Sequence, residues 1–400
     1  MSIERKVKDM KKEYIDGKET NGLKYDFALI RKEFKKLKIP TEFYSPIKCP
    51  FEKCKWFVNL SDRSTGKTTN WFLLGMTMNK LYGTTIQYIR QTNDMITPRN
   101  SKNLFDTILS YGYVEKITDG EYNTIVYNSR RWYYATSDEN GNIINQDNRH
   151  FMCMLSIDNA ENYKSSYNAP YGDIIIFDEF IGKYYYRNEF VRFNDLLKTI
   201  IRDRLSPFIV MLANTIDKNS QYFNELEIYQ SVQNMHPGDN EIITSERGTT
   251  IYVELLESGV KKQKSRSIVN KLFFGWKNPL ISSITGDDWS IDNYPHTPSE
   301  KCKVVLKKYY IDFNNNLIAL DVLYNDTIGL FVSVHYANST YDDSIIFTIN
   351  DINEQNKRYR FGYTKSDKKL WELYKRHKFF YASNDLGSLI ENYVKQCLKL

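Results

Sequence analysis

The chain has 400 residues, of which 41% are hydrophobic and 26% charged, and its formal net charge is +6. This length suffices for two or three domains with cores of their own, and the composition is ordinary for a globular protein, which excludes collagen-like and low-complexity chains. The mild positive charge permits contact with a polyanion without requiring it.

The first 40 residues predict a helical extension that is rich in Lys and Glu. The stretch DFALIRKEFKKLK places Phe27, Ile30, Phe34 and Leu37 at helical spacing. Pro40 is expected to end this helix. The charged N-terminus lacks an apolar segment of the kind found in signal peptides, so none is expected.

Residues 41–257 alternate between strand and helix patterns. The run DIIIFDEF at 173–180 is continuously apolar before its acidic end, as expected of a buried central strand. Buried strands separated by helices predict an α/β domain with a parallel sheet covered on both faces. The expected elements are strands at 55–61, 84–92, 173–180 and 207–215, a hairpin at 123–137, helices at 66–83 and 193–204, and a polar loop at 138–149.

The sequence pattern changes beyond residue 257. We expect a polar, basic linker over 258–285 and a second domain of α+β type over 286–400. Turn signals FNNN and YND separate three expected strands, SIIFTIND is a fourth, and DLGSLIENYVKQCLKL predicts a closing helix.

Cysteine usage and hydropathy narrow the class of protein further. The five cysteines are odd in number and scattered, and the five histidines are dispersed, so we expect no disulfide framework and no structural metal site. This indicates a reducing compartment. No apolar run approaches the roughly 20 residues of a membrane span, so no membrane partner is expected.

One short stretch nearly fits the phosphate-binding loop pattern G-x-x-x-x-G-K-[ST]. In SDRSTGKTT the second glycine, the lysine and the hydroxyl are present, whereas Ser61 stands at the place of the first glycine. The stretch follows a predicted strand and opens a predicted helix, the context in which backbone N–H groups and the helix N-terminus face a phosphate. Lys67 would reach the β- and γ-phosphates, and Thr68 would hold Mg²⁺. The predicted nucleotide-binding residues are Ser61, Asp62, Arg63, Ser64, Thr65, Gly66, Lys67, Thr68 and Thr69.

A plain surface turn at the start of a helix is the alternative reading of this stretch. The acidic pair that ends DIIIFDEF argues against it, because the two motifs occur in the order that a nucleotide hydrolase requires. We assign Asp178 to the Mg²⁺ shell and Glu179 to the attacking water. Two solvated carboxylates at a strand end remain the alternative for this pair.

Three further polar residues and one in the loop are candidates for catalysis. Asn214 ends the buried strand PFIVMLANT and would sense the γ-phosphate, unless it only caps a turn. Arg202 and Arg204 could act on a neighbouring subunit as arginine fingers, or could pair with Asp203 or face solvent. Arg63, inside the loop, could touch the γ-phosphate or a neighbouring subunit.

These motifs together resemble a known family. SDRSTGKTT with its arginine, then IIIFDEF, then IVMLANT, resembles the DNA-packaging (encapsidation) ATPases of small short-tailed phages, which are related to the ATPase of large terminases. The resemblance covers about residues 55–225. It implies an ASCE-type P-loop ATPase that uses ATP and Mg²⁺. Ser61 departs from the pattern at one position where serine can also make the turn.

The resemblance also implies partners and a location. The protein would form a homo-oligomeric ring, commonly a pentamer, at the portal vertex of a procapsid in the host-cell cytoplasm. ATP hydrolysis would drive double-stranded DNA inward through the portal. Rings need heterologous subunit contacts, which suits an arginine acting between subunits. Ring size and the presence of a structural RNA stay open.

Members of this family carry a C-terminal domain similar to RNase H-type nucleases. The strand and helix pattern of residues 303–400 is compatible with that fold, and Asp312 and Asp321 lie on its first two predicted strands. The residues do not complete a metal-binding cluster, so we expect a vestigial domain that docks on the portal or contacts nucleic acid. A live nuclease, as in terminases, is the alternative.

DNA contacts are expected mainly at phosphates, because a translocase must ignore sequence. The candidates are Arg187, Lys261, Lys262, Lys264 and Arg266, each of which could instead belong to a solvated charge run. Two rival functions remain. A helicase or another P-loop ring ATPase would use the same motifs, and a DNA- or capsid-binding scaffold with a decayed nucleotide site would explain Ser61.

Overall fold

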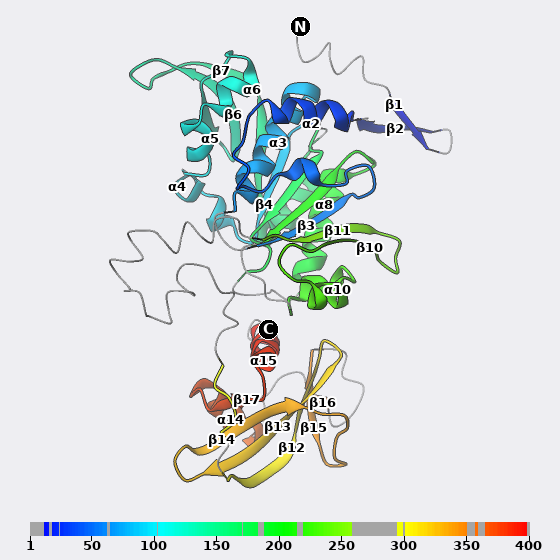
Figure 1. Cartoon of the computed structure of the whole chain (residues 1–400), viewed down its shortest axis with the longest axis vertical. Helices are drawn as coiled ribbons and strands as arrows, with labels where there is room; N and C mark the ends of the chain where they lie inside the picture. Colours follow the sequence, from blue (N-terminus) through cyan, green and yellow to red (C-terminus); the bar gives the residue numbers. More distant parts are fainter. Residues whose placement is uncertain are drawn as a thin grey trace. The chain divides into compact units, whose positions relative to one another are not determined.

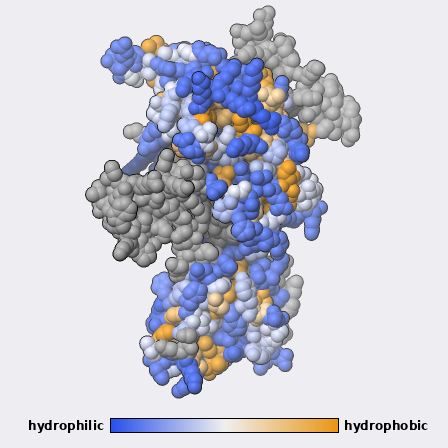
Figure 2. Space-filling view, in the orientation of Figure 1, coloured by the Kyte–Doolittle hydropathy of each residue, from blue (hydrophilic) through white to orange (hydrophobic). Residues whose placement is uncertain are grey.

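The computed structural model describes residues 12–15, 18–23, 25–61, 65–101, 103–169, 171–182, 188–213, 219–257, 294–298, 301–349, 357–358 and 365–397. The chain forms two compact units (Figure 1). The larger unit comprises Met1–Gly182, Asn188–Ile216 and Leu226–Asp287, and the smaller comprises Lys183–Arg187, Asp217–Glu225 and Asp288–Leu400. On the face seen in Figure 2, hydrophobic side chains are confined to small separate patches.

A nine-stranded sheet organises the larger unit, in the order β10-β11-β3-β9-β8-β4-β7-β6-β5. Neighbouring strands are parallel from β11 to β7, which confirms the predicted parallel centre. The strands are β3 (Trp56–Leu60), β4 (Ile86–Arg90), β5 (Thr124–Asn128), β6 (Arg131–Ser137), β7 (Ile143–Ser156), β8 (Ile174–Asp178), β9 (Phe208–Ala213), β10 (Asn240–Thr244) and β11 (Thr250–Leu255).

Helices cover both faces of this sheet, as the continuous apolar strands require. Successive residues of β8 point to opposite faces. Ile176 belongs to the core cluster that contains Trp71 of α3 (Lys67–Tyr82), whereas the Phe177 ring lies 4.9 Å from that of Phe193 on α8 (Glu189–Ile201). The hydrophobic effect thus holds α3 and α8 on opposite faces of the sheet.

Shorter helices complete the larger unit. They are α2 (Phe27–Lys35), α4 (Pro98–Ser101), α5 (Asp106–Ser110), α6 (Tyr113–Thr118), α7 (Ala160–Ser166) and α10 (Tyr229–Asn234), with 3₁₀ turns at η1 (Pro46–Lys48), η2 (Asn93–Ile96) and η3 (Ile157–Asn159). Within the parts of the chain that the structure describes, no helix has both the length and the apolarity to cross a bilayer.

The N-terminal region differs from the predicted helical extension. β1 (Lys12–Ile15) and β2 (Lys18–Leu23) pair as antiparallel strands, and among the described residues before Pro40 the helix is α2. Asp26 caps α2 by accepting the N–H of Leu29 at 3.0 Å. Ile30 and Phe34 lie in the same core cluster as Trp71, so α2 is an integral part of the larger unit's core.

The hairpin expected at 123–137 is present as β5 and β6. The polar loop expected at 138–149 is much shorter, because β7 begins at Ile143 and pairs with β6. The turn is closed by Asp138, whose carboxylate accepts the N–H groups of Asn140 and Asn142 at 2.9 and 2.8 Å. Backbone pairing with β6 therefore overrides the polar composition of this segment.

The smaller unit is built on a six-stranded sheet in the order β16-β15-β12-β13-β14-β17. β12, β13 and β14 are antiparallel, as predicted, and β15 and β16 run parallel to β12. The elements are β12 (Lys303–Phe313), β13 (Asn316–Asn325), β14 (Gly329–Tyr336), β15 (Ile345–Thr348), β16 (Lys357–Arg358), β17 (Phe379–Tyr381), α9 (Gln221–Glu225), α14 (Lys365–Lys375) and α15 (Asn384–Cys397).

The closing helix α15 supplies most of the smaller unit's helical core. Leu389, Ile390 and Tyr393 of α15 are buried in one cluster with Ile311 and Leu320 of the sheet. On the opposite face, the described residues form a small cluster of Tyr310, Ala319 and Ile346. The sheet of this unit thus has one principal core face.

Gly75 marks the closest approach of α3 to the sheet. A Cβ atom at this position would lie 2.6 Å from side-chain atoms of the buried Ile86 in β4. We expect Gly75→Val to destabilise the larger unit by about 2–3 kcal/mol, because an overpacked core must shift. The denaturant midpoint measures this. Lys32→Val on the exposed side of α2 is the control and should cost at most about 0.5 kcal/mol. Equal midpoints for both variants would contradict the close packing.

Candidate active site

The candidate site lies at the carboxyl ends of the central strands. β9 pairs with β3 on one side and with β8 on the other, and all three are parallel. Ser61 follows the last residue of β3, and Asp178 is the last residue of β8. Because parallel strands end at the same edge, this topology brings the two predicted motifs together at the crevice where α/β proteins bind ligands.

Ser61 ties the two ends of the predicted loop together. Its backbone N–H donates to the Ala213 carbonyl at 3.2 Å. Its hydroxyl lies 2.9 Å from that of Thr65 and accepts a hydrogen bond from the ammonium of Lys67. All three side chains are buried. The serine that replaces the expected glycine is therefore compatible with the loop and holds the lysine in place.

The start of α3 is suited to an anion. Gly66 precedes the helix in a left-handed conformation (φ 77°) and, being a glycine, offers no side-chain cap of its own. The conformation favours glycine, and a Cβ atom at Gly66 would crowd the Phe43 ring at 3.1 Å. The N–H groups of a helix N-terminus and the helix dipole favour a phosphate at this point.

The acidic pair meets the loop through Thr68 and Asp178. The Thr68 hydroxyl lies 3.2 Å from both carboxylate oxygens of Asp178. The Tyr88 hydroxyl donates to the same carboxylate at 2.9 Å. Burial raises the pKa of Asp178, and the nearby Arg90 and the Tyr88 hydrogen bond oppose that rise. The predicted pair of magnesium ligands thus lies together in the structure.

Arg90 is a central site residue that sequence reasoning missed. It ends β4, which pairs with β8. One guanidinium nitrogen lies 3.0 Å from the Tyr88 hydroxyl and 3.8 Å from Asp178, and the other donates to the Glu179 carboxylate. Burial alone would lower the pKa of Arg90. Tyr88, Asp178 and Glu179 raise it by a larger amount, so the net shift is upward and the side chain stays cationic.

Glu179 has an unusual backbone conformation. Its φ is 53°, in the left-handed region that non-glycine residues rarely adopt, and its N–H donates to the Asp178 carboxylate at 3.1 Å. Such conformations cost about 1–3 kcal/mol and concentrate at functional sites. The side chain is 42% exposed, so solvent water can reach the carboxylate. The arrangement turns Glu179 away from the strand direction and toward Arg90.

The residues present fit a nucleoside triphosphate with Mg²⁺. A hydroxyl and a carboxylate are the oxygen ligands that Mg²⁺ prefers, and Lys67 and the start of α3 suit phosphates. Within the described residues, no three His, Cys, Asp or Glu side chains gather as a metal site. A site with few protein ligands is typical of Mg²⁺, which takes its remaining ligands from phosphate and water.

Arg204 corrects the sequence prediction. Its guanidinium is buried and pairs with Asp173, which precedes β8 at the end of the strand opposite Asp178. It also donates to the carbonyls of Gly172 and Ile200 at 3.3 and 2.7 Å. A buried guanidinium with these partners in its own unit argues against the predicted role of Arg204 as an arginine finger.

The structure places Arg202 beyond the end of α8, away from the acidic pair. Its exposed side chain donates to the Tyr167 carbonyl at 3.2 Å. Thr65 is buried, and Thr69 lies in the first turn of α3 beside a cavity. The remaining predicted residues lie outside the described part of the chain: Asp62, Arg63, Ser64, Arg187, Asn214, Lys261, Lys262, Lys264 and Arg266.

Comparison with solved structures finds phage packaging motors. The Phi-28 gp11 DNA packaging motor matches with a TM-score of 0.52 and 17% identity, covering 90% of this chain and 99% of that one. The bacteriophage Phi-29 viral genome packaging motor assembly matches with a TM-score of 0.51 and 17% identity over 89% and 99%. The N-terminal domain of the phi29 DNA packaging ATPase has a TM-score of 0.42 and 18% identity over 54% and 97%.

No family model matches the chain, and no curated protein matches it significantly. At 17% identity the structural matches establish a shared fold. They confirm, at the level of the fold, the predicted resemblance to phage DNA-packaging ATPases. The first two matches extend over nearly the whole length of both chains, and thus beyond the residues whose motifs carry the resemblance.

Arg90 allows a test of the site's electrostatics. We expect Arg90→Met to destabilise the larger unit by about 3 kcal/mol, because it removes the stronger of the two cations that act on the buried Asp178 carboxylate. Chemical denaturation measures the loss, and adding Asp178→Asn should recover part of it. Lys80→Met, which removes a 2.7 Å pair with the exposed Asp119, is the control and should cost less than about 1 kcal/mol. Equal losses at both positions would refute this assignment.

Proposed function

We propose that this protein is an ATPase that drives double-stranded DNA through a portal into a viral procapsid. The observation that carries the proposal is the meeting of Lys67 and Thr68 with Asp178 and Glu179 at one sheet edge, in a fold shared with phage packaging motors. The strand order, with the loop after β3 and the acidic pair after β8, supports the ASCE-type P-loop class predicted from the sequence.

Each residue has a defined task in ATP hydrolysis. Lys67 and the N–H groups at the start of α3 bind the β- and γ-phosphates. Thr68 and Asp178 would hold Mg²⁺, which when bound neutralises charge on the phosphates. Glu179 orients the attacking water and accepts its proton. Because Glu179 lies against Arg90, its carboxylate must leave this ion pair, at least in part, before it can take a proton.

Arg63 and Asn214 are proposed to contact the γ-phosphate, and Arg202 is the remaining candidate for an arginine acting between subunits. The support for this role of Arg202 is that its side chain is exposed at the end of α8. The proposal includes a homo-oligomeric ring, because a finger in trans needs heterologous contacts. The net charge of +6 is compatible with phosphate contacts along DNA.

The smaller unit is proposed to be an RNase H-like domain without nuclease activity. Three antiparallel strands flanked by the parallel β15 support the fold. Asp312 lies in register with Leu317 of β13 and Thr348 of β15, not with another carboxylate. Asp321 follows Leu317 by four residues, or about 13 Å along the strand, and pairs with Lys307 and His335 at 3.2 Å. The two aspartates therefore cannot share one metal ion.

Glu179→Gln tests the proposed chemistry. We expect ATP hydrolysis to fall about 10²- to 10⁴-fold while ATP binding persists, because the variant keeps the side-chain shape and loses the base. Steady-state phosphate release and equilibrium binding of ATP measure the two effects. Glu121→Gln, an exposed carboxylate of the same unit, is the control and should leave both unchanged.

Duplex DNA and procapsids distinguish the proposed motor from its rivals. The motor should be stimulated by duplex DNA and should protect DNA from nuclease when procapsids are present. Strand separation from single-stranded tails would instead indicate a helicase. A wild-type protein that neither binds nor hydrolyses ATP would overturn the proposal in favour of a scaffold.

The smaller unit gives a separate prediction. We expect a supercoiled plasmid to stay uncut by the full-length protein with Mg²⁺ or Mn²⁺, because Asp312 and Asp321 are too far apart to act on one ion. Gel electrophoresis measures cutting. Cutting that Asp312→Asn abolishes would contradict the assignment and establish a terminase-like motor with a live nuclease.

A further inference from the structure

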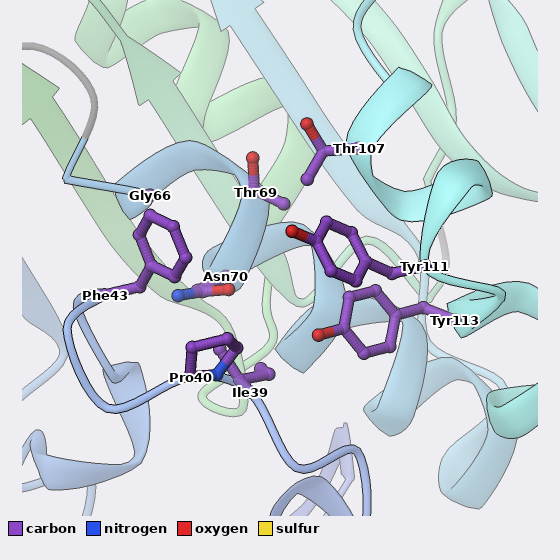
Figure 3. A pocket seen from close by; sticks show the side chains of 9 residues that line it. All are labelled: Ile39, Pro40, Phe43, Gly66, Thr69, Asn70, Thr107, Tyr111 and Tyr113. Atoms are coloured by element: carbon purple, nitrogen blue, oxygen red, sulfur yellow. The ribbon is translucent and has the colours of Figure 1, made fainter. Parts of the chain in front are cut away.

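A cavity beside the start of α3 takes no part in the steps of ATP hydrolysis proposed above. It has a volume of about 250 Å³, and its lining includes Phe43, Gly66, Thr69, Asn70, Tyr111 and Tyr113 (Figure 3). Pockets that enclose whole small ligands measure about 300–1,000 Å³, so this one has room for part of a nucleotide. Gly66 and Thr69 flank Lys67 and Thr68 in the chain, so the cavity borders the residues proposed to bind phosphate.

We propose that this cavity binds the adenine ring of the nucleotide, a role that rests on the nucleotide site proposed above. The segment before β3 supplies one wall and the connection between α5 and α6 supplies another. The base is recognised by stacking on aromatic rings and by one hydrogen bond to its amino group.

Aromatic side chains stand on two sides of the cavity. Figure 3 shows Phe43 on one side and Tyr111 and Tyr113 on the other, with Asn70 between them. The two tyrosine rings stack on each other, with centroids 5.8 Å apart and an interplanar angle of 22°. Tyr113 is buried, whereas Tyr111 is 55% exposed, so its ring can rearrange over a ligand without disturbing the core. Nucleobases stack on such rings irrespective of sequence.

Asn70 supplies the hydrogen bond that selects the base. Its side chain is buried, and its amide nitrogen donates to the Tyr44 carbonyl. That bond fixes the amide plane, and Figure 3 shows the amide oxygen directed to the side of the tyrosines. The oxygen can accept from the 6-amino group of adenine, whereas guanine presents a carbonyl oxygen at that position. The residues that line the cavity within the described part of the chain carry no charge.

Tyr111→Ala and Tyr111→Phe test the stacking wall. We expect Tyr111→Ala to raise the KM for ATP about 5- to 100-fold with little change in kcat, and Tyr111→Phe to resemble the wild type, because only the ring is needed. Inhibition by inorganic tripolyphosphate should be the same in all three proteins, because that anion has no base. Steady-state ATP hydrolysis by the full-length protein gives all three readouts.

Asn70 is tested through the nucleotide, because its amide nitrogen also holds Tyr44 and its replacement would disturb the wall. Inosine triphosphate carries a carbonyl where ATP has the amino group. We expect the wild type to show a KM about tenfold higher for inosine triphosphate than for ATP. Equal KM values for the two nucleotides would overturn the role of Asn70.

The outcomes of these experiments distinguish the proposed base pocket from the proposed phosphate site. An unchanged KM for ATP in Tyr111→Ala, beside an active wild type that tripolyphosphate inhibits, would overturn the base pocket and leave the phosphate site standing. Weaker inhibition by tripolyphosphate in Tyr111→Ala would also overturn it, because the variant would then act on the phosphate site. A wild type that binds neither ATP nor tripolyphosphate would overturn both proposals.

Discussion

The burial of the Asp178 carboxylate at the end of β8 is the constraint on which the candidate site depends. Removing a carboxylate from water costs several kcal/mol unless other groups compensate for the lost hydration. Thr68 and Tyr88 supply hydroxyls at 3.2 and 2.9 Å, and Arg90 supplies a positive charge at 3.8 Å. At an effective dielectric constant of about 20, that charge contributes a gross attraction of about 4 kcal/mol. Attraction and desolvation therefore nearly cancel, so stability alone does not account for this cluster.

The same cluster determines how Glu179 is placed. Asp178 accepts the Glu179 N–H, and Arg90 binds the Glu179 carboxylate. The buried carboxylate and the cation that compensates for its charge therefore also hold the next residue in its left-handed conformation. The strain at Glu179 is thus supported by contacts from β4 and β8. An exposed carboxylate on a strained backbone beside a buried one is the arrangement expected of a general base next to a metal ligand.

The sequence allowed prediction of those site residues whose neighbours are close in the chain. Lys67 and Thr68 follow an apolar strand and open a helix, and Asp178 and Glu179 end a continuous apolar run, so local pattern located all four. Arg90 was missed because its partners lie almost 90 residues further along, across the β4–β8 pairing. The same reason explains the misassigned Arg204, whose partner Asp173 precedes another strand, and the polar residues of β7, which are ordered by pairing with β6.

The cavity walls depend on contacts of this same long-range kind. The Tyr44 backbone N–H donates to the Thr65 carbonyl at 2.9 Å, and its hydroxyl donates to Asn59, which also accepts from the Trp71 indole. A buried polar network with its members paired rigidifies the segment that carries it. Phe43, the preceding residue, is therefore fixed against Gly66 before any ligand binds, and little conformational entropy remains to be lost on that side. The exposed Tyr111 is the wall that a base must order, at a cost of about 0.5–1.5 kcal/mol for an immobilised side chain, which stacking exceeds.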